Sequence, residues 1–138
     1  MTAIFGNILD QALELNLQRQ AINANYRHNF EPHMWMREFC TVRLQIGRGC
    51  GHTMAIRSRS KRDDLVIVPS SFHIMTMSEN RVEKPTVISS TDPNAIVLRG
   101  KTFKRIWVDD ASIRSDGDIR NVYVIALMHR AEQIILVG

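Results

Sequence analysis

The chain contains few of the residues that stabilise secreted or metal-bound domains. Only two of its 138 residues are cysteines, Cys40 and Cys50, and their spacing fits neither a disulfide framework nor a zinc site. Metal-ligand spacing is also absent from four of the histidines, which are His28, His33, His73 and His129. We therefore expect two reduced thiols in a cytoplasmic protein.

Long apolar runs are absent as well. No stretch reaches the roughly 18 apolar residues of a membrane span, and the first residues lack the apolar segment of a secretion signal. We therefore expect no membrane partner. The apolar share of 44% is enough to bury one core, so we expect a single domain over 1–138 with an N-terminal helical segment over about 1–40.

Apolar residues alternate between helical and strand spacing along the chain. Helical spacing covers Ile4–Ile22, Thr53–Ser60 and, with a strand as the alternative, Val122–His129, whereas Met34–Phe39 is predicted to be a short turn. Strands are predicted at Thr41–Ile46, Leu65–Val68, Thr86–Ser90, a segment ending at Asp109, and the final apolar run 131–138. This order favours an α/β fold in three layers, a parallel sheet with helices on both faces.

The stretch "LQIGRGCGHTMAI", residues 44–56, reads as a strand, a glycine-rich turn and the start of a helix. A phosphate-binding loop needs glycines for close backbone approach, a following helix that aims its N–H groups at the phosphates, and a hydroxyl for Mg²⁺. Gly47, Gly49 and Gly51 meet the first need, a helix from His52 the second, and Thr53 the third. The stretch alone does not separate a nucleotide site from a structural turn, because His52 stands where lysine is usual.

A pair of acids, Asp109 and Asp110, ends the strand of "FKRIWVDD". Adjacent carboxylates at a strand's C-terminal end suit a site where one holds Mg²⁺ and the next polarises an attacking water. The alternative is two solvated acids in a strand-to-loop turn. The order of glycine loop, apolar strand, acidic strand end and last apolar strand favours the nucleotide site.

These segments resemble the ATPase core of P-loop NTPases of the helicase and phage-terminase kind. "IGRGCGHT" resembles a degenerate Walker A loop, "LRGKTFKRIWVDDAS" resembles the Walker B strand and its lead-in, and "QIILVG" resembles the strand that follows Walker B. The resemblance implies ATP with Mg²⁺ as ligand, Thr53 and Asp109 at the metal, and Asp110 as catalytic residue. It also implies that the nucleotide is bound by Gly47, Arg48, Gly49, Cys50, Gly51, His52 and Thr53.

Two departures from the family pattern bear on activity. Imidazole at His52 is shorter than lysine and mostly neutral at pH 7, so triphosphate binding should be weaker unless Arg48, Arg99 or Lys101 supplies the charge. Asp110 is one methylene shorter than the usual glutamate and would sit further from an attacking water. We therefore expect nucleotide binding with slow or absent hydrolysis.

Two functions follow from these features. The first is a small ATP-binding P-loop NTPase-like protein of phage or mobile-element origin, which would act in the host cytoplasm. The alternative is a non-enzymatic interaction or DNA-binding module on a decayed NTPase fold, in which the basic run "RSRSKR" at 57–62 could contact DNA. A core of this length often completes its site with a neighbouring subunit, so self-association is a further expectation.

The resemblance also makes a topological prediction. In this NTPase class the strand after Walker B inserts between the phosphate-loop strand and the Walker B strand. Ile134–Val137 should therefore lie between Val42–Ile46 and Arg105–Asp109, with all three strands parallel. Direct pairing of the two outer strands would require a different α/β class.

Overall fold

The computed structural model describes residues 2–45, 47 and 51–138 of the chain. Its α-helices are α1 (Thr2–Ile22), α2 (Pro32–Phe39), α3 (His52–Arg59), α4 (Ile74–Ser78) and α5 (Asp116–Met128). Its strands are β1 (Thr41–Leu44), β2 (Leu65–Ile67), β3 (Thr86–Ile88), β4 (Arg105–Asp109) and β5 (Gln133–Val137). Short 3₁₀ turns connect them: η1 (Ala24–Asn29), η2 (Ser71–His73), η3 (Ile96–Leu98) and η4 (Ala111–Ile113).

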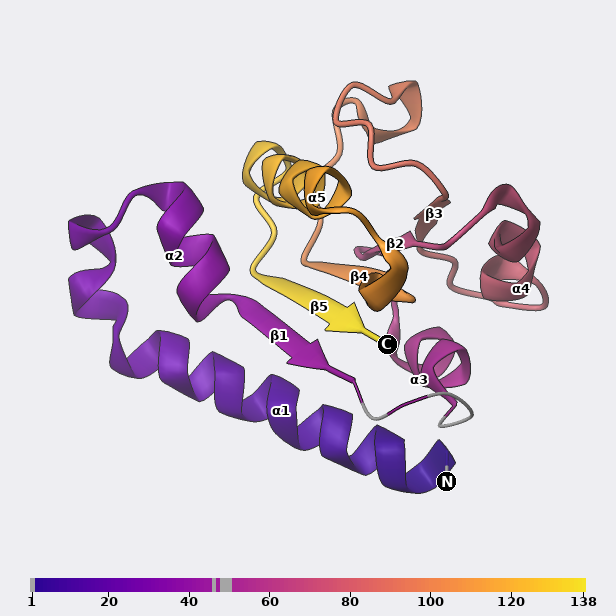
Figure 1. Cartoon of the computed structure of the whole chain (residues 1–138), viewed down its shortest axis with the longest axis horizontal. Coiled ribbons are helices and arrows are strands. Elements are labelled where there is room, and N and C mark those ends of the chain that lie inside the picture. Colours follow the sequence, from indigo (N-terminus) through magenta and orange to yellow (C-terminus); the bar gives the residue numbers. More distant parts are fainter. Residues whose placement is uncertain (1, 46, 48–50) are drawn as a thin grey trace.

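The strands form one parallel sheet in the order β1-β5-β4-β2-β3 (Figure 1). β5 is thus an interior strand between β1 and β4, with Thr41 of β1 opposite Ile134 and Asp109 of β4 opposite Val137. The prediction that the final strand separates the other two is confirmed. As a result, β1 and β4 end at the same edge of the sheet, one strand apart.

Helices cover both faces of this sheet, as the apolar strands require (Figure 1). Alternate residues of β5 face opposite sides, with Ile134 and Leu136 packed in the cluster that α2 and α5 cover. Ile135 and Val137 pack in the other cluster, with residues of α1 and α3. The predicted α/β arrangement of a parallel sheet with helices on both faces is therefore confirmed.

The longest helix, α1, uses only one of its faces for this packing. Phe5, Leu9 and Leu13 are buried against the sheet, whereas Ile4 and Ile22 are among the apolar residues left exposed. Among the described residues, no helix combines the length and the apolar character that a membrane crossing requires.

The segment predicted to be a turn at Met34–Phe39 is instead part of the helix α2. Pro32 stands in the first turn of α2, where its fixed backbone angle favours a helix start and its missing N–H costs nothing. Trp35 and Met36 then bury one face of the helix in the core. The short helix α4 was not predicted either.

The predicted strands have the right positions, and β4 ends at Asp109 as predicted, but three of the others end earlier than expected. β1 stops at Leu44, β2 at Ile67 and β3 at Ile88. The predicted end of the first strand, Ile46, lies outside the described residues. The helix favoured for Val122–His129 is confirmed as α5, which starts earlier because Ser115 caps it, with the Ser115 hydroxyl accepting from the amide of Asp118.

A buried carboxylate, Asp64, ties the start of β2 to β4. Asp64 is 1% exposed, and its Oδ2 accepts from the indole of Trp107 at 3.0 Å, from the amide of Lys61 at 2.9 Å, and from the Nη2 of Arg105 at 3.2 Å. The only other ion pair among the described residues, Arg59 with Asp10, is more exposed. The two pairs should therefore contribute differently to stability.

Asp64→Asn should lower the free energy of unfolding by about 3 kcal/mol, because it leaves buried donors and Arg105 without their charged partner. Asp10→Asn makes the same chemical change at an exposed pair and should cost less than about 1 kcal/mol. Urea denaturation of both variants measures the difference. Equal costs would contradict the assigned role of Asp64.

Candidate functional site

A cavity of about 560 Å³ opens where β1, β4 and β5 end. Its lining comes from the glycine-rich segment, from the start of α3 and from the residues that follow β4 and β5. The described lining residues are Gln45, Gly47, Gly51, His52, Thr53, Met54, Asp110, Ser112, Ile113 and Gly138. The predicted ligands Arg48, Gly49 and Cys50 lie outside the described residues.

Glycines shape the entry to α3. Gly47 and Gly51 have positive φ angles of 117° and 79°, a region that side chains with a Cβ rarely adopt. Gly51 occupies the N-cap position of α3, and no side chain caps the helix there. The first backbone N–H groups of a helix have no partner within it, so these donors face the end at which the cavity lies.

The hydroxyl of Thr53 donates to Oδ2 of Asp109 at 2.8 Å. The other carboxylate oxygen, Oδ1, accepts from the amide of Asp110 at 3.0 Å. Thr53 lies in the first turn of α3 and Asp109 ends β4, so this bond joins the two segments singled out from the sequence. The fold thus places a hydroxyl oxygen and a carboxylate next to each other at the base of the loop.

Asp109 is held in an environment unfavourable for its charge. The carboxylate is 1% exposed, and this burial raises the pKa of Asp109 above its ordinary value. The hydrogen bond from Thr53 opposes the rise, and the neighbouring charge of Asp110 adds to it. A cation beside Asp109 would favour the ionised form, because it would neutralise the charge that burial disfavours.

Asp110 differs from its neighbour in exposure and in backbone conformation. It is half-buried, lines the cavity, and has a φ of 53° and a ψ of 45°. Aspartate tolerates this left-handed conformation better than most residues. The turn lets two consecutive acids differ in environment: Asp109 lies in the core, and Asp110 at the cavity wall.

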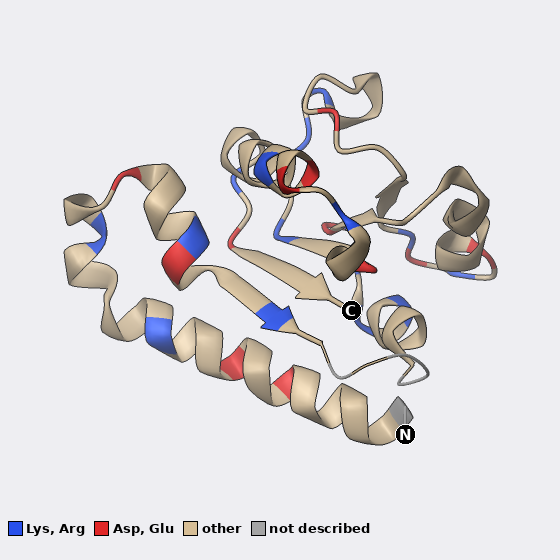
Figure 2. Ribbon diagram, in the orientation of Figure 1, with Lys and Arg blue, Asp and Glu red and all other residues tan. Residues whose placement is uncertain are grey.

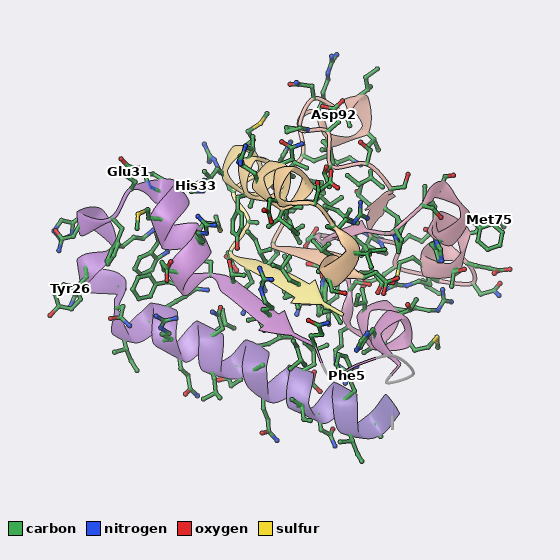
Figure 3. The ribbon with its side chains drawn as sticks, viewed as in Figure 1. Phe5, Tyr26, Glu31, His33, Met75 and Asp92 are labelled. Atoms are coloured by element: carbon green, nitrogen blue, oxygen red, sulfur yellow. The ribbon has the colours of Figure 1, made fainter. Side chains whose placement is uncertain are left out.

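His52 packs beside Phe5, with the two ring centroids 4.7 Å apart and tilted. Phe5 lies on α1 (Figure 3). The Nε2 of His52 is buried and has no hydrogen-bond partner among the described residues. A buried nitrogen of this kind usually has a hydrogen-bond partner, so Nε2 of His52 is an exception. Among the described lining residues, His52 is the only basic side chain.

Two of the predicted sources of positive charge, Lys101 and Arg99, are not at this cavity, and the third, Arg48, lies outside the described residues. Lys101 donates to the hydroxyl of Thr86, which begins β3, at the opposite edge of the sheet. Arg99 lines a separate hollow with Met128. Both precede β4 and so lie near the N-terminal ends of the parallel strands, whereas the cavity lies at the C-terminal ends.

The basic run at 57–62 also contributes to the fold. Arg57 donates to the carbonyl oxygens of Thr76 and Glu79, and Arg59 pairs with Asp10. These contacts hold α3 against α4 and α1. The side chains of Arg57 and Arg59 are thus already engaged within the chain.

Gly138 is a cavity residue that the sequence analysis did not single out. Its amide donates to the carbonyl of Leu44 at 3.0 Å, and its carbonyl accepts from the amide of Ser112 at 2.6 Å. A Cβ on Gly138 would lie 3.2 Å from Nδ1 of His52 and 3.3 Å from Cα of Asp110. Its position just after a predicted strand could have indicated a role in the site, because the residues that follow parallel strands form the ligand-binding edge of α/β sheets.

The oxygen pair of Thr53 and Asp109 suits a hard cation that takes its remaining ligands from water and phosphate. The described residues contain no group of three or more His, Cys, Asp or Glu side chains that could hold a metal. A cation held by these two oxygens would need its further ligands from outside the described residues.

Asp109→Asn should make the protein more stable at neutral pH, because the amide oxygen can accept from Asp110, the amide nitrogen can donate to the Thr53 hydroxyl, and no charge is buried. Between the ordinary pKa of aspartate and the raised pKa of Asp109, the unfolded chain releases the proton first, so wild-type stability falls as pH rises. The gain should be about 1.4 kcal/mol for each pKa unit of the rise. Urea denaturation of both proteins from pH 3 to pH 8 measures it.

The difference in stability between the two proteins should be small at pH 3, grow with pH, and then become constant. A difference that does not change with pH would show that the charge of Asp109 is not what destabilises the fold.

Comparisons of the chain with protein-family models, with curated proteins and with solved structures found no match. The function of the protein therefore has to be argued from the geometry of the site itself.

Proposed function

We propose that the protein binds ATP with Mg²⁺ in the cavity beside Thr53, and hydrolyses it slowly, as a diverged P-loop NTPase-like domain. The observation that carries this proposal is the hydrogen bond between Thr53 at the start of α3 and Asp109 at the end of β4. A hydroxyl after a glycine turn and a buried carboxylate at a strand end are the two oxygens that such domains direct at the metal. The position of β5 between β1 and β4 also supports the proposal of a P-loop NTPase-like domain.

The phosphates would lie at the start of α3. The glycine-rich segment allows close approach of the backbone, and the first N–H groups of the helix donate to anions. His52 contributes its unpartnered Nε2. Bound Mg²⁺ would neutralise phosphate charge that His52 alone does not balance.

Asp110 is the residue suited to activating water. It lines the cavity next to the metal-binding oxygens and is less buried than Asp109, so it can accept a proton without first leaving the core. Its short side chain and the lack of a second described basic residue in the cavity both favour slow turnover. Binding is therefore the primary activity that we propose.

Titration of labelled ATP with and without Mg²⁺ tests the proposal. Affinity should be higher with Mg²⁺, and Asp109→Ala should remove this gain, because the variant loses the metal's protein carboxylate. Asp110→Asn should leave affinity nearly unchanged and lower any hydrolysis rate by about 100-fold. Asp63→Asn, at an exposed acid before β2, is the matched control and should change neither quantity.

Small and equal effects of Asp109→Ala and Asp110→Asn would identify ordinary acids without separate roles. Absence of ATP binding in the wild type, with or without Mg²⁺, would favour the alternative of a non-enzymatic module on this fold.

His52→Lys should strengthen ATP binding, because lysine carries a fixed charge on a longer stem and its methylenes can pack where imidazole contacts Phe5. We expect a gain of about tenfold in affinity, the size of one added charge-assisted hydrogen bond. Isothermal titration of both proteins with Mg²⁺-ATP measures it. If the lysine variant binds no better, the side chain at position 52 does not face the phosphates.

A further inference from the structure

A second cavity, of about 590 Å³, lies between α2, β1 and α5 and is rich in arginine. Its basic side chains come from four elements: Arg37 from α2, Arg43 from β1, Arg114 from the end of η4 and Arg120 from α5. Figure 2 shows the corresponding blue segments on α2, β1 and α5. The arginines come from two parts of the chain, 37–43 and 114–120, which only the fold brings together.

None of these arginines forms an ion pair in the described part of the chain, although the charge of Arg114 acts on the carboxylate of Asp118. The ion pairs found there, Arg59 with Asp10 and Arg105 with Asp64, lie elsewhere. The one acid that lines the cavity, Asp116, forms no ion pair with them. Four like charges around one hollow repel each other, and a bound anion would relieve that repulsion.

The floor of the cavity is held by contacts within the chain. Tyr123 is buried, and its hydroxyl and that of Thr41 share a hydrogen bond of 2.9 Å. His33 lies over Tyr123, with ring centroids 5.6 Å apart. Arg114 is anchored from behind, since its Nη2 donates to the carbonyl of Val68, while its Nε is buried without a partner. The guanidinium groups thus surround a fixed surface.

We propose that this arginine cavity binds phosphate groups, independently of the nucleotide site. Guanidinium groups match phosphate oxygens in pairs of parallel hydrogen bonds, and groups from several directions suit an anion with more than one phosphate. Two sources share this chemistry, free oligophosphate and the backbone of a single nucleic-acid strand. The cavity adjoins the nucleotide site, because Ser112 lines both, but it needs neither Mg²⁺ nor Asp109.

The test uses fluorescence binding of the full chain without Mg²⁺, in EDTA, with inorganic tripolyphosphate or a 12-nucleotide single strand as ligand. Arg43→Gln and Arg120→Gln change exposed side chains and should each weaken tripolyphosphate binding by about tenfold. Asp116→Asn removes the only acid of the described lining and should strengthen tripolyphosphate binding by a few fold. A gain in affinity cannot arise from misfolding.

Two controls locate the site. Arg62→Gln makes the same change at an exposed arginine before β2, at the opposite edge of the sheet, and should have no effect. His52→Ala removes the only basic side chain of the described nucleotide-cavity lining and should bind tripolyphosphate as the wild type does, which separates this proposal from the nucleotide site.

The two ligands distinguish the sources. Binding of tripolyphosphate alone would support the proposal with a free anion as ligand, and binding of the strand in competition with tripolyphosphate would support it with a nucleic-acid backbone. The proposal is overturned if neither ligand binds, if Arg62→Gln weakens binding as much as Arg43→Gln, or if Asp116→Asn weakens it.

Discussion

The pairing of β5 with both β1 and β4 is the constraint on which the site depends. Neighbouring strands lie about 4.8 Å apart, so one inserted strand separates β1 and β4 by roughly 10 Å at the edge where they end. This spacing leaves room for the start of α3 between the two ends. Thr53 can therefore reach Asp109, and Gly138 closes the floor between them through Leu44 and Ser112.

The position of Asp109 shows a conflict between stability and chemistry. A buried carboxylate in an apolar sheet lowers the stability of the fold, and one hydroxyl and one amide only partly offset this cost. Asp64, equally buried, is instead supplied with three donors, one of them an arginine. The fold thus supplies Asp64 with enough donors to offset its burial. Asp109 has fewer donors, and its oxygens can still bind a cation.

The sequence predicted the regular elements because their apolar spacing is strong. The short apolar runs mark strands, whereas the helix start at Ser115 was not recognised, so α5 was predicted to begin only at Val122. Strand order came only from the resemblance, since spacing within one segment carries no information on its neighbours. The helix over Met34–Phe39 was missed because the apolar residues Trp35 and Met36 acquire their partners from distant parts of the chain.

Part of the site could also be predicted from sequence patterns. Thr53 and Asp109 each stand at the end of an element with a recognisable pattern, and a parallel sheet brings such ends together. Gly138 was missed because its role depends on three segments that meet only in the fold. The arginine cavity has no local signature at all, because each of its elements supplies a single arginine.

The interior position of β5 also determines when the sheet can form. A ribosome makes β1 first and β5 last, so the nascent chain contains β2, β3 and β4, which can pair with one another, while β1 still has no neighbour. Only the arrival of β5 joins the two parts, through contacts between residues far apart in the chain. Such contacts form slowly, because a long loop must close before they can stabilise anything. During synthesis, the edges of β1 and β4 that later pair with β5 are therefore open to other strands, and this interval is when the chain is most prone to aggregate.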